Sequence, residues 1–332
     1  MAGVRAIVQD RYGSSDILEL RDIDPPVPAA GEVLVRVRAA SVNAYDWHFM
    51  RGDPYLARLT MGLRAPKVKV RGRDFAGTVE SVGAGVTGLQ PGDEVYGGAD
   101  GAFAEFVCAK DASVATKPAN LTFEQAAAVP MAGVTALMGL RDAGRIQPGQ
   151  RVLVNGASGG VGTCAVQLGK AFGAEVTGVC STRNVDLVAS LGADRAIDYT
   201  HEDFVVDGRA DGRRYDVVFD LVGNRSLTDL RRVLTSTGTL VLSGGGQSMG
   251  GSLIGPMGLM MRSTMVAPFV KQRLRQLIAK QSKENLVTLR DLVESGKLTP
   301  VIERTYPLAE AAQAIRYLET EHPRAKLVVT VP

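Results

Sequence analysis

The sequence predicts an α/β protein that combines a β-rich N-terminal unit with a parallel, doubly wound sheet. Residues 1–120 contain short β-rich runs separated by turn residues, whereas strand and helix patterns alternate from Thr122 onward. A glycine-rich turn joins a strand to a helix at residues 151–162. Alternation of this kind is typical of a parallel sheet that is covered by helices.

The N-terminal unit is predicted from β-rich runs that end at turn residues. One of these ends is the Gln-Pro-Gly-Asp turn at residues 90–93. The predicted strands cover residues 4–9, 32–39, 77–82, 94–96 and 102–109. We therefore expect an all-β unit before the first helix.

The second unit is predicted from apolar runs that are each followed by a helical pattern. Its strands are expected at residues 151–155, 175–179, 194–197, 216–220, 238–242 and 274–279. A helix at 284–295 then precedes a strand, a helix and a strand at 300–304, 308–318 and 325–331. No internal repeat is visible in the sequence.

The glycine-rich turn is the strongest functional signal. Gly156, Gly159 and Gly162 recur at intervals of three between an apolar strand and a helix. Glycines at such positions allow a tight turn and bring backbone N–H groups and the helix N-terminus close to a pyrophosphate. An ordinary strand-to-helix turn is the alternative, but the second strand at 175–179 favours a dinucleotide site. The expected contacts are Gly156, Ser158, Gly159, Gly160, Val161 and Gly162.

The end of the second strand predicts which dinucleotide binds. NAD sites usually carry an acidic residue there, whereas this chain has Cys180 followed by Ser181, Thr182 and Arg183. A guanidinium and two hydroxyls can bind a 2′-phosphate that a carboxylate would repel. We therefore expect NADP(H) as the cofactor. As purely structural residues, Ser181 or Thr182 would cap the next helix and Arg183 would be solvated.

Composition excludes several classes of function. The chain has 332 residues, 45% of them hydrophobic, which is enough for two ordinary domains of a globular protein. Its net charge of +3 is too small to indicate a nucleic-acid surface. The three cysteines show no metal or disulfide spacing, so we expect a reducing cytoplasm.

Neither secretion nor a membrane partner is expected. The N-terminus enters a strand without a basic and apolar leader. Residues 233–261 carry no charge, but their many glycines make them a poor transmembrane segment. We interpret them as a strand, a glycine turn and a loop.

Several motifs together resemble one enzyme family. They are Ser41-Val42-Asn43, the Gly-Thr-Val-Glu-Ser-Val-Gly run at 77–83, Pro-Gly-Asp-Glu-Val at 91–95, the glycine turn, Leu-Gly-Ala at 191–193, Asp-Leu-Val-Gly at 220–223 and Ala-Lys-Leu-Val-Val at 325–329. Over nearly its whole length the chain resembles the medium-chain dehydrogenase/reductase superfamily, specifically its zinc-free quinone oxidoreductase and enone reductase branch. The resemblance implies a homodimer.

The resemblance also implies a GroES-like β-domain beside a Rossmann domain, with the active site in the cleft between them. The GroES-like domain would comprise residues 1–122 and 266–332, and the NADP-binding Rossmann domain residues 123–265.

The resemblance further implies that no zinc binds. Zinc-dependent relatives have Cys, His and Cys where this chain has Asn43, Arg73 and Met131. These residues cannot form a catalytic zinc site, because arginine is not deprotonated in proteins and three N, S or carboxylate ligands are needed. We expect Arg73 to fill the place of the metal and to pair with Asp46.

Without zinc, reduction of a simple ketone lacks its electrophile. Hydride addition to an enone or a quinone leaves a delocalised anion that a hydrogen-bond donor can stabilise. We therefore expect an NADPH-dependent reductase whose small-molecule substrate is a quinone or an α,β-unsaturated carbonyl. The alternatives are an NADP-dependent alcohol/ketone oxidoreductase that works without zinc, and a non-catalytic NADPH-binding structural or regulatory protein.

Candidate catalytic residues follow the Ser-Val-Asn motif. Tyr55 or His48 could donate a proton as general acid; alternatively, Tyr55 packs at a loop edge and His48 lies on a helix surface. Asn43 and Asp46 would shape the floor of the cleft, or would simply be local turn and cap groups.

Further cofactor contacts are expected from distant segments. Thr135, Gly244 and Gly245 would border the nicotinamide, and Val222, Gly223 and Asn224 the ribose; the glycines could instead be a flexible exit from the fifth strand. A basic run without acids contains Arg58, Arg64, Lys67, Lys69, Arg71 and Arg73. Such runs are usually solvated loops, and the alternative is a lid that attracts an anion.

Overall fold

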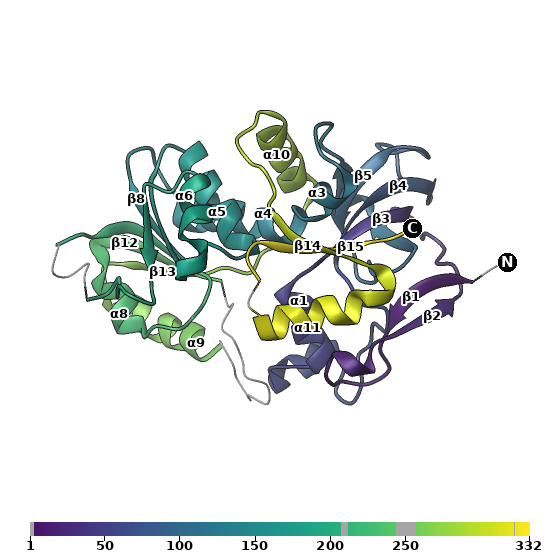
Figure 1. Cartoon of the computed structure of the whole chain (residues 1–332), viewed down its shortest axis with the longest axis horizontal. Helices are drawn as coiled ribbons and strands as arrows, with labels where there is room; N and C mark the ends of the chain where they lie inside the picture. The colour runs from purple at the N-terminus through teal and green to yellow at the C-terminus, as the bar shows by residue number, and fades with distance from the viewer. Residues whose placement is uncertain (1–2, 207–211, 244–256, 322) are drawn as a thin grey trace.

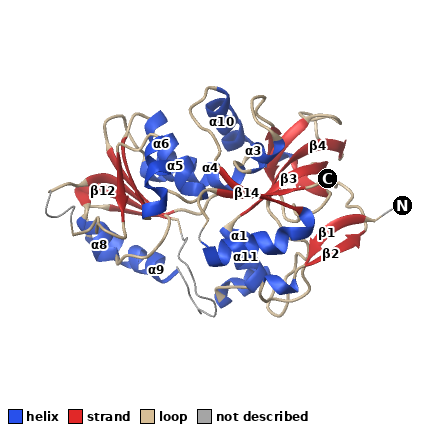
Figure 2. Cartoon of the chain, in the orientation of Figure 1, coloured by secondary structure: helices blue, strands red, loops and turns tan. Residues whose placement is uncertain are grey.

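The computed structural model describes residues 3–206, 212–243, 257–321 and 323–332. Two units built around separate sheets lie side by side (Figure 1). Each unit has helices packed against its sheet (Figure 2). The fold is α/β, with a GroES-like unit and a parallel Rossmann-type sheet.

The Rossmann-type sheet has six strands in the order β10-β9-β8-β11-β12-β13. The strands are β8 (Arg151–Asn155), β9 (Glu175–Cys180), β10 (Arg195–Asp198), β11 (Tyr215–Asp220), β12 (Leu234–Leu242) and β13 (Arg273–Gln276). Every neighbouring pair is parallel, and the chain runs outward from the central β8 in both directions. Ligands bind such sheets at the carboxyl ends of the strands, where the strand order reverses.

Helices connect and cover these strands. They are α4 (Pro130–Leu137), the π-helix η4 (Met138–Gly144), α5 (Gly160–Ala171), η5 (Thr182–Asn184), α6 (Val185–Ser190), α8 (Leu227–Arg232), α9 (Met257–Val266), η6 (Ala267–Phe269) and α10 (Lys283–Glu294). Because β13 pairs with β12, the Rossmann-type unit extends beyond the expected boundary at residue 266. Its sixth strand hydrogen-bonds in this sheet and not in the GroES-like one.

The GroES-like sheet has the order β14-β15-β3-β4-β5-β7, with β6 also paired to β3. Its strands are β3 (Glu32–Val42), β4 (Asp74–Val82), β5 (Glu94–Gly98), β6 (Phe106–Lys110), β7 (Val114–Thr116), β14 (Ile302–Pro307) and β15 (Lys326–Thr330). A separate pair is formed by β1 (Val4–Val8) and β2 (Glu19–Ile23). The strand expected at 102–109 begins only at residue 106, and Ala104 before it makes an isolated bridge to Ala6.

The remaining helices belong to the GroES-like unit or to its junction. They are η1 (Ser15–Ile17), α1 (Ala44–Arg51), η2 (Tyr55–Ala57), α2 (Arg58–Met61), η3 (Asp111–Ser113), α3 (Phe123–Ala127), η7 (Leu308–Glu310) and α11 (Ala311–Glu321). The helix expected at 308–318 therefore starts as a 3-10 turn after Pro307, and its α-helical part begins at residue 311.

The end of β3 lies between two hydrophobic cores. Along its first part, buried and more exposed residues alternate, as expected for a strand with one buried face, but residues 39–42 are all buried. Ala39 packs in the core shared with the Rossmann-type unit, whereas Ala40 and Val42 pack in the GroES-like core. In the antiparallel register with β15, Val328 lies opposite Ser41. This arrangement places the Ser-Val-Asn motif beside the last strand of the chain.

Candidate functional site

The glycine loop after β8 leaves no room for a side chain at Gly156 or Gly162. Gly156 has a φ of 91°, and a Cβ atom there would lie 2.7 Å from Val222 Cγ2. A Cβ atom on Gly162 would lie 2.1 Å from the carbonyl oxygen of Gly156. The loop therefore requires glycine at both positions, and it passes close to the segment after β11.

Side-chain hydrogen bonds tie the segment after β11 to the end of β8. Asn155 Nδ2 donates to Asp220 Oδ1 at 2.8 Å and to Asn224 Oδ1 at 3.0 Å. The same Asp220 oxygen accepts from the backbone N–H groups of Val222 and Gly223 at 3.2 and 3.1 Å. Val222, Gly223 and Asn224 thus lie at the carboxyl ends of the two central strands, as a site beside the glycine loop requires.

The start of β15 docks directly on the glycine loop. The Ala325 N–H donates to the Ser158 carbonyl at 2.6 Å, and Ala325 has the left-handed φ of 59°. A Cβ atom on Gly160 would lie 2.8 Å from Lys326 Cδ. The GroES-like unit therefore contacts the loop expected to hold the pyrophosphate, a contact for which the sequence has no signal.

The residues after β9 form two sets of side-chain contacts. Asn184 Nδ2 donates to both Ser158 Oγ and Ser181 Oγ, each at 3.1 Å, and we call these three residues the nucleotide cluster. Thr182 Oγ1 lies 2.8 Å from Thr200 Oγ1. Arg183 is exposed and donates to the Glu321 carbonyl at 2.9 Å. Ser181 precedes η5 as its N-cap, but its hydroxyl caps no backbone N–H.

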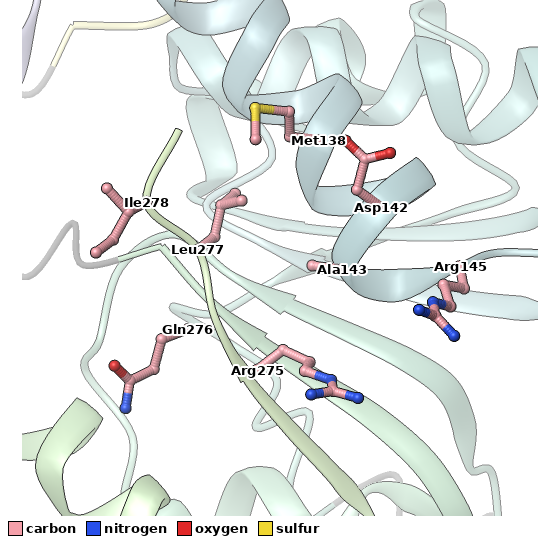
Figure 3. A pocket seen from close by; sticks show the side chains of 8 residues that line it. All are labelled: Met138, Asp142, Ala143, Arg145, Arg275, Gln276, Leu277 and Ile278. Carbon is pink, nitrogen blue, oxygen red and sulfur yellow. The ribbon is translucent and has the colours of Figure 1, made fainter. Parts of the chain in front are cut away.

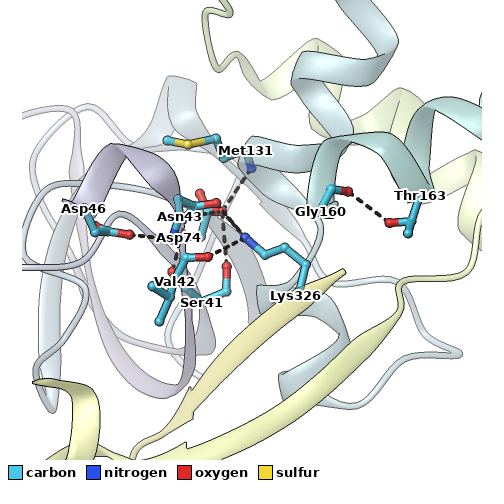
Figure 4. A network of polar contacts seen from close by, with 9 residues as sticks. All are labelled: Ser41, Val42, Asn43, Asp46, Asp74, Met131, Gly160, Thr163 and Lys326. Carbon is cyan, nitrogen blue, oxygen red and sulfur yellow. Dashed lines mark hydrogen bonds and ion pairs between the residues drawn. The ribbon is translucent and has the colours of Figure 1, made fainter. Parts of the chain in front are cut away.

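A second group of polar residues is buried at the end of β3 (Figure 4). We call Ser41, Asn43, Asp74 and Lys326 the floor cluster. Asp74 Oδ2 accepts from Ser41 Oγ at 3.3 Å, from Asn43 Nδ2 at 3.1 Å and from the Met131 N–H at 3.1 Å. These contacts join β3, β4 and α4.

Lys326 supplies the cation of the floor cluster. Its Nζ donates to Asn43 Oδ1 at 2.5 Å and to the Val42 carbonyl at 3.1 Å, and lies 3.9 Å from Asp74 Oδ2. Burial lowers the pKa of Lys326 and raises the pKa of Asp74, and each charge opposes the shift of the other. Sequence reasoning missed both residues, because nothing in the local sequence marks their pairing.

Asn43, Arg73 and Met131, which stand where zinc-dependent relatives have their ligands, do not fit a zinc ion. Asn43 offers an amide and Met131 a thioether, and Arg73 cannot lose its proton. The Lys326 ammonium bonded to Asn43 would repel a divalent cation. Within the described residues, no three His, Cys, Asp or Glu side chains are grouped closely enough to hold a metal.

The expected pairing of Arg73 with Asp46 is wrong. Arg73 Nη1 pairs with Asp100 Oδ1 at 2.8 Å, and its guanidinium lies 5.5 Å from the Tyr45 ring centroid. The Tyr45 hydroxyl donates to the same Asp100 oxygen at 3.2 Å. Asp100 lies in the loop after β5, and only the pairing of β4 with β5 brings it beside residue 73, so the sequence carries no local signal for this ion pair.

Asp46 and Asn43 lie in a capping box of α1, the local role given as the alternative to shaping the floor of the cleft. Asp46 Oδ2 accepts from the Asn43 N–H at 2.8 Å, and the Asp46 N–H donates to the Asn43 carbonyl at 3.0 Å. Burial raises the pKa of Asp46 to about 7, while the hydrogen bond from Asn43 opposes this shift. Asn43 thus belongs both to the cap and to the floor cluster.

The two candidate proton donors differ in their surroundings. His48 Nδ1 lies 2.8 Å from the Asp53 carbonyl, which only accepts, so Nδ1 carries the hydrogen and the neutral ring has none on Nε2. Burial lowers the pKa of His48 and favours this neutral form. Tyr55 is 46% exposed, and the Arg58 guanidinium lies 4.6 Å from its ring centroid. Of the two, Tyr55 has the more accessible ring.

Thr135 is buried on α4, one turn after Met131, whereas Gly244 and Gly245 lie outside the described residues.

The basic run at residues 58–73 is only partly a solvated loop. Arg71 is buried, and the Arg58 guanidinium lies 4.5 Å from the Tyr12 ring centroid and 4.6 Å from that of Tyr55. Arg64 and Lys67 are exposed.

A pocket of about 350 Å³ lies elsewhere on the Rossmann-type unit, between η4 and the end of β13 (Figure 3). It is lined by Met138, Asp142, Ala143, Arg145, Arg275, Gln276, Leu277 and Ile278. None of these residues belongs to the glycine loop or to the nucleotide cluster, so the pocket is not the expected cofactor site.

Comparisons with known proteins agree with this geometry. Residues 29–119 match the alcohol dehydrogenase GroES-like domain, and residues 191–329 match a zinc-binding dehydrogenase model. The chain is 34% identical to the mitochondrial NAD(P)H oxidoreductase RTN4IP1 of Mus musculus, over 98% of this chain and 89% of the relative. It is also 34% identical to 2-methylene-furan-3-one reductase of Solanum lycopersicum, over 96% and 76% of the two chains.

A solved structure is similar over the whole chain. The quinone oxidoreductase of Escherichia coli, complexed with NADPH, has a TM-score of 0.84 at 26% identity and covers 98% of this chain and 99% of its own. Fold and site together define an oxidoreductase that uses a nicotinamide cofactor. The chain belongs to the quinone oxidoreductase branch of the medium-chain dehydrogenase/reductase superfamily. Among the helices described, none is both long and apolar enough to cross a membrane.

Proposed function

We propose that the protein is an NADPH-dependent, zinc-independent reductase that delivers hydride to a quinone or an α,β-unsaturated carbonyl. The floor cluster is the observation that carries this proposal. Where zinc-dependent relatives hold their metal, Asn43 pairs with the Lys326 ammonium and with Asp74, and this donor set does not suit zinc. A substrate whose own conjugation stabilises the developing charge needs no Lewis acid.

The residues present fit a dinucleotide. The glycine loop from Gly156 to Gly162 would hold the pyrophosphate at the N-terminus of α5, and Ser181 and Arg183 would lie at the 2′-phosphate. Val222, Gly223 and Asn224 would border the ribose, and Thr135 the nicotinamide. When bound, NADPH supplies the hydride, and the protein orients it. The NADPH complex of the Escherichia coli relative supports this choice.

Tyr55 is the proposed proton donor. Its ring is exposed, whereas His48 carries its hydrogen on the nitrogen that faces the Asp53 carbonyl. A general acid contributes about 10²–10⁴-fold to a rate. Tyr55→Phe should therefore lower kcat at least about a hundredfold for an enone and leave NADPH binding unchanged. A Phe variant with wild-type kcat would exclude Tyr55 as the donor.

The reductase proposal is tested by following NADPH oxidation with a simple quinone, an enone and a saturated ketone, with and without a chelator. We expect turnover of the first two that is insensitive to the chelator. Turnover of the ketone alone would favour the alcohol/ketone oxidoreductase, and NADPH binding without any turnover would favour a structural or regulatory protein. Metal analysis that finds one zinc per chain would contradict the proposed mechanism.

We further propose a homodimer formed through the Rossmann-type sheet. Among the described strands, β13 lies at the edge of its sheet. Ile278, just beyond β13, is 83% exposed, and Phe269 is 86% exposed. An unpaired edge with exposed apolar side chains suits a second copy of the same edge. Light scattering after gel filtration should give twice the chain mass. The double variant Phe269→Asp/Ile278→Asp should give a monomer; a wild-type monomer would exclude the dimer.

We propose a cytoplasmic location, because Cys108, Cys164 and Cys180 are all free thiols. Burial raises the pKa of Cys108 and Cys180 to about 11, which keeps both thiols protonated and unreactive. Subcellular fractionation tests the location, and recovery of the protein in an organelle would contradict it.

A further inference from the structure

Ser181 and Thr182, which follow β9, differ in whether their hydroxyl hydrogens are donated to another group of the protein. A serine or threonine hydroxyl has one hydrogen to donate and two lone pairs that accept. The oxygens of an ionised phosphate accept strong hydrogen bonds. A hydroxyl can therefore bind a phosphate only if no protein acceptor has taken its hydrogen.

Thr182 has no hydrogen left for a ligand. Thr200 Oγ1 lies 2.7 Å from Asp198 Oδ1 and must donate to it, because an ionised carboxylate only accepts. Thr182 Oγ1, at 2.8 Å from Thr200 Oγ1, must therefore donate to Thr200. His201 Nδ1 also donates to Asp198, at 2.9 Å from Oδ2. Partial desolvation opposes ionisation of Asp198, but hydrogen bonds from Thr200 and His201 hold its pKa below the usual range.

The nucleotide cluster has the opposite polarity. The side-chain amide of Asn184, only 4% exposed, donates to Ser158 Oγ and Ser181 Oγ, so both hydroxyl oxygens act as acceptors. The hydrogens of these hydroxyls remain available. Asn184 Oδ1 is buried and has no partner within the part of the chain that is described. The opposite amide orientation would instead bury two unpaired N–H donors, which costs more than one unpaired carbonyl.

Resting on the proposed use of NADPH, we propose that Asn184 is a positioning residue for the 2′-phosphate. By donating to Ser158 and Ser181, it keeps the hydrogens of both hydroxyls free for an anion. Because Ser158 lies in the glycine loop and Ser181 follows β9, Asn184 also fixes the two halves of the anion site relative to one another. Thr182, whose hydrogen is used within the protein, is excluded from the donors to the phosphate.

The experiment measures the Kd of NADPH and of NADH with the full-length protein by titration calorimetry. Ser181→Ala should weaken NADPH about tenfold, the loss expected for one hydrogen bond to a charged group, and leave NADH within about twofold. Asn184→Leu removes both donated hydrogen bonds at similar volume and should weaken NADPH about fivefold. Because Asn184 acts partly through Ser181 and partly through Ser158, the double variant should bind NADPH worse than Ser181→Ala alone but better than the product of the two single losses predicts.

Thr182→Val is the matched control, since it removes a neighbouring hydroxyl whose hydrogen is already used. It should change the Kd of NADPH by less than about twofold. Thermal unfolding without cofactor checks that each variant is folded. If Asn184→Leu does not fold, Asn184→Asp keeps the shape but replaces the donor by an acceptor, and should weaken NADPH by more than Ser181→Ala does.

Two results would overturn the role of Asn184 but leave the proposed cofactor intact. One is that the effects of Asn184→Leu and Ser181→Ala on the Kd of NADPH are fully additive. The other is that every Asn184 variant keeps the wild-type preference for NADPH over NADH. A wild-type protein that binds NADH as tightly as NADPH would overturn both this proposal and the proposed cofactor. Selective NADPH binding without turnover of quinone or enone would overturn only the reductase.

Discussion

The floor cluster and the nucleotide cluster use their hydrogen-bond donors in different ways. In the floor cluster, Lys326, Asn43 and Ser41 all donate to protein acceptors, and both N–H bonds of the Asn43 amide are used. In the nucleotide cluster, Asn184 donates to two hydroxyls whose own hydrogens have no protein acceptor among the described residues. Donors that bond within the protein hold the structure together, whereas donors left without a protein acceptor can be offered to a ligand.

Loss of the cation from the floor cluster should have the largest effect on stability. Lys326→Met leaves Asp74 buried without its opposite charge, and breaking a buried pair in this way costs about 3–5 kcal/mol. Chemical unfolding of the apoprotein measures the loss. Lys110→Met, at an exposed position of β6, is the control and should stay within about 0.5 kcal/mol. A loss below about 1 kcal/mol for Lys326→Met would show that the cluster is not a structural anchor.

Asp46→Asn should change how stability depends on pH. The pKa of Asp46 is raised by burial from 3.8 to about 7, so the folded protein binds this proton more tightly than the unfolded chain. The stability contributed by the neutral acid is therefore lost as pH rises from about 4 through 7. Asparagine does not titrate, so the variant should gain stability relative to wild type over this range, by at most about 4 kcal/mol.

Unfolding by urea at pH 5 and pH 8 checks this prediction, and parallel pH curves for the two proteins would contradict it. Asp46→Ala should be less stable than Asp46→Asn at each pH. Alanine removes the acceptor for the Asn43 N–H, and loss of a cap typically costs about 1 kcal/mol. Neither variant should alter the preference between NADPH and NADH, because Asp46 lies on α1 and not in the nucleotide cluster.

Arg183→Glu tests the nucleotide side. It replaces an attractive charge by a repulsive one beside Ser181, and hydrogen bonds to charged groups contribute about 1.5–3 kcal/mol. NADPH affinity should fall about tenfold or more, while NADH should change little. A wild-type protein that uses both cofactors and a variant that keeps the same ratio would disprove the role of Arg183.

The smallest effect on stability is expected for the ion pair between Arg73 and Asp100, which is present in place of the predicted pair of Arg73 with Asp46. The side chains of Arg73 and Asp100 are 28% and 40% exposed, and pairs of this kind contribute about 0.2–1 kcal/mol. A double-mutant cycle with Arg73→Ala and Asp100→Ala measures the coupling. A coupling energy above about 2 kcal/mol would contradict this prediction and show that the Arg73–Asp100 pair stabilises the fold as a buried pair does.

The predictable features of the fold were those carried by neighbouring residues. The strand at 151–155 and the glycine turn are recognisable because the apolar run, the glycines and the helix follow one another in the sequence. The helix at 284–295 is likewise present within one residue of its predicted bounds. The end of the Rossmann-type unit was placed too early, because the pairing of β13 with β12 spans a long connection that leaves no local signal.

The missing parts of the site are contacts between distant segments. Lys326 reaches Asn43 because β15 lies antiparallel to β3, and Asp100 reaches Arg73 because β5 lies beside β4. Neither partner can be chosen from sequence spacing alone. Asn184 was missed for a different reason. It follows the predicted phosphate contacts directly, but its role depends on which serine oxygens its amide faces, and only the folded backbone determines that.

The bond between Ala325 and Ser158 implies an order of assembly. The strands of the Rossmann-type sheet all lie between residues 151 and 276, whereas the GroES-like sheet needs β3 to meet β15 from the far end of the chain. Contacts between distant segments form slowly, because a long loop must close first. During refolding, sheet formation in the Rossmann-type unit should therefore precede the docking of Ala325. A stopped-flow trace of NADPH binding should lag behind the circular dichroism signal of the sheet.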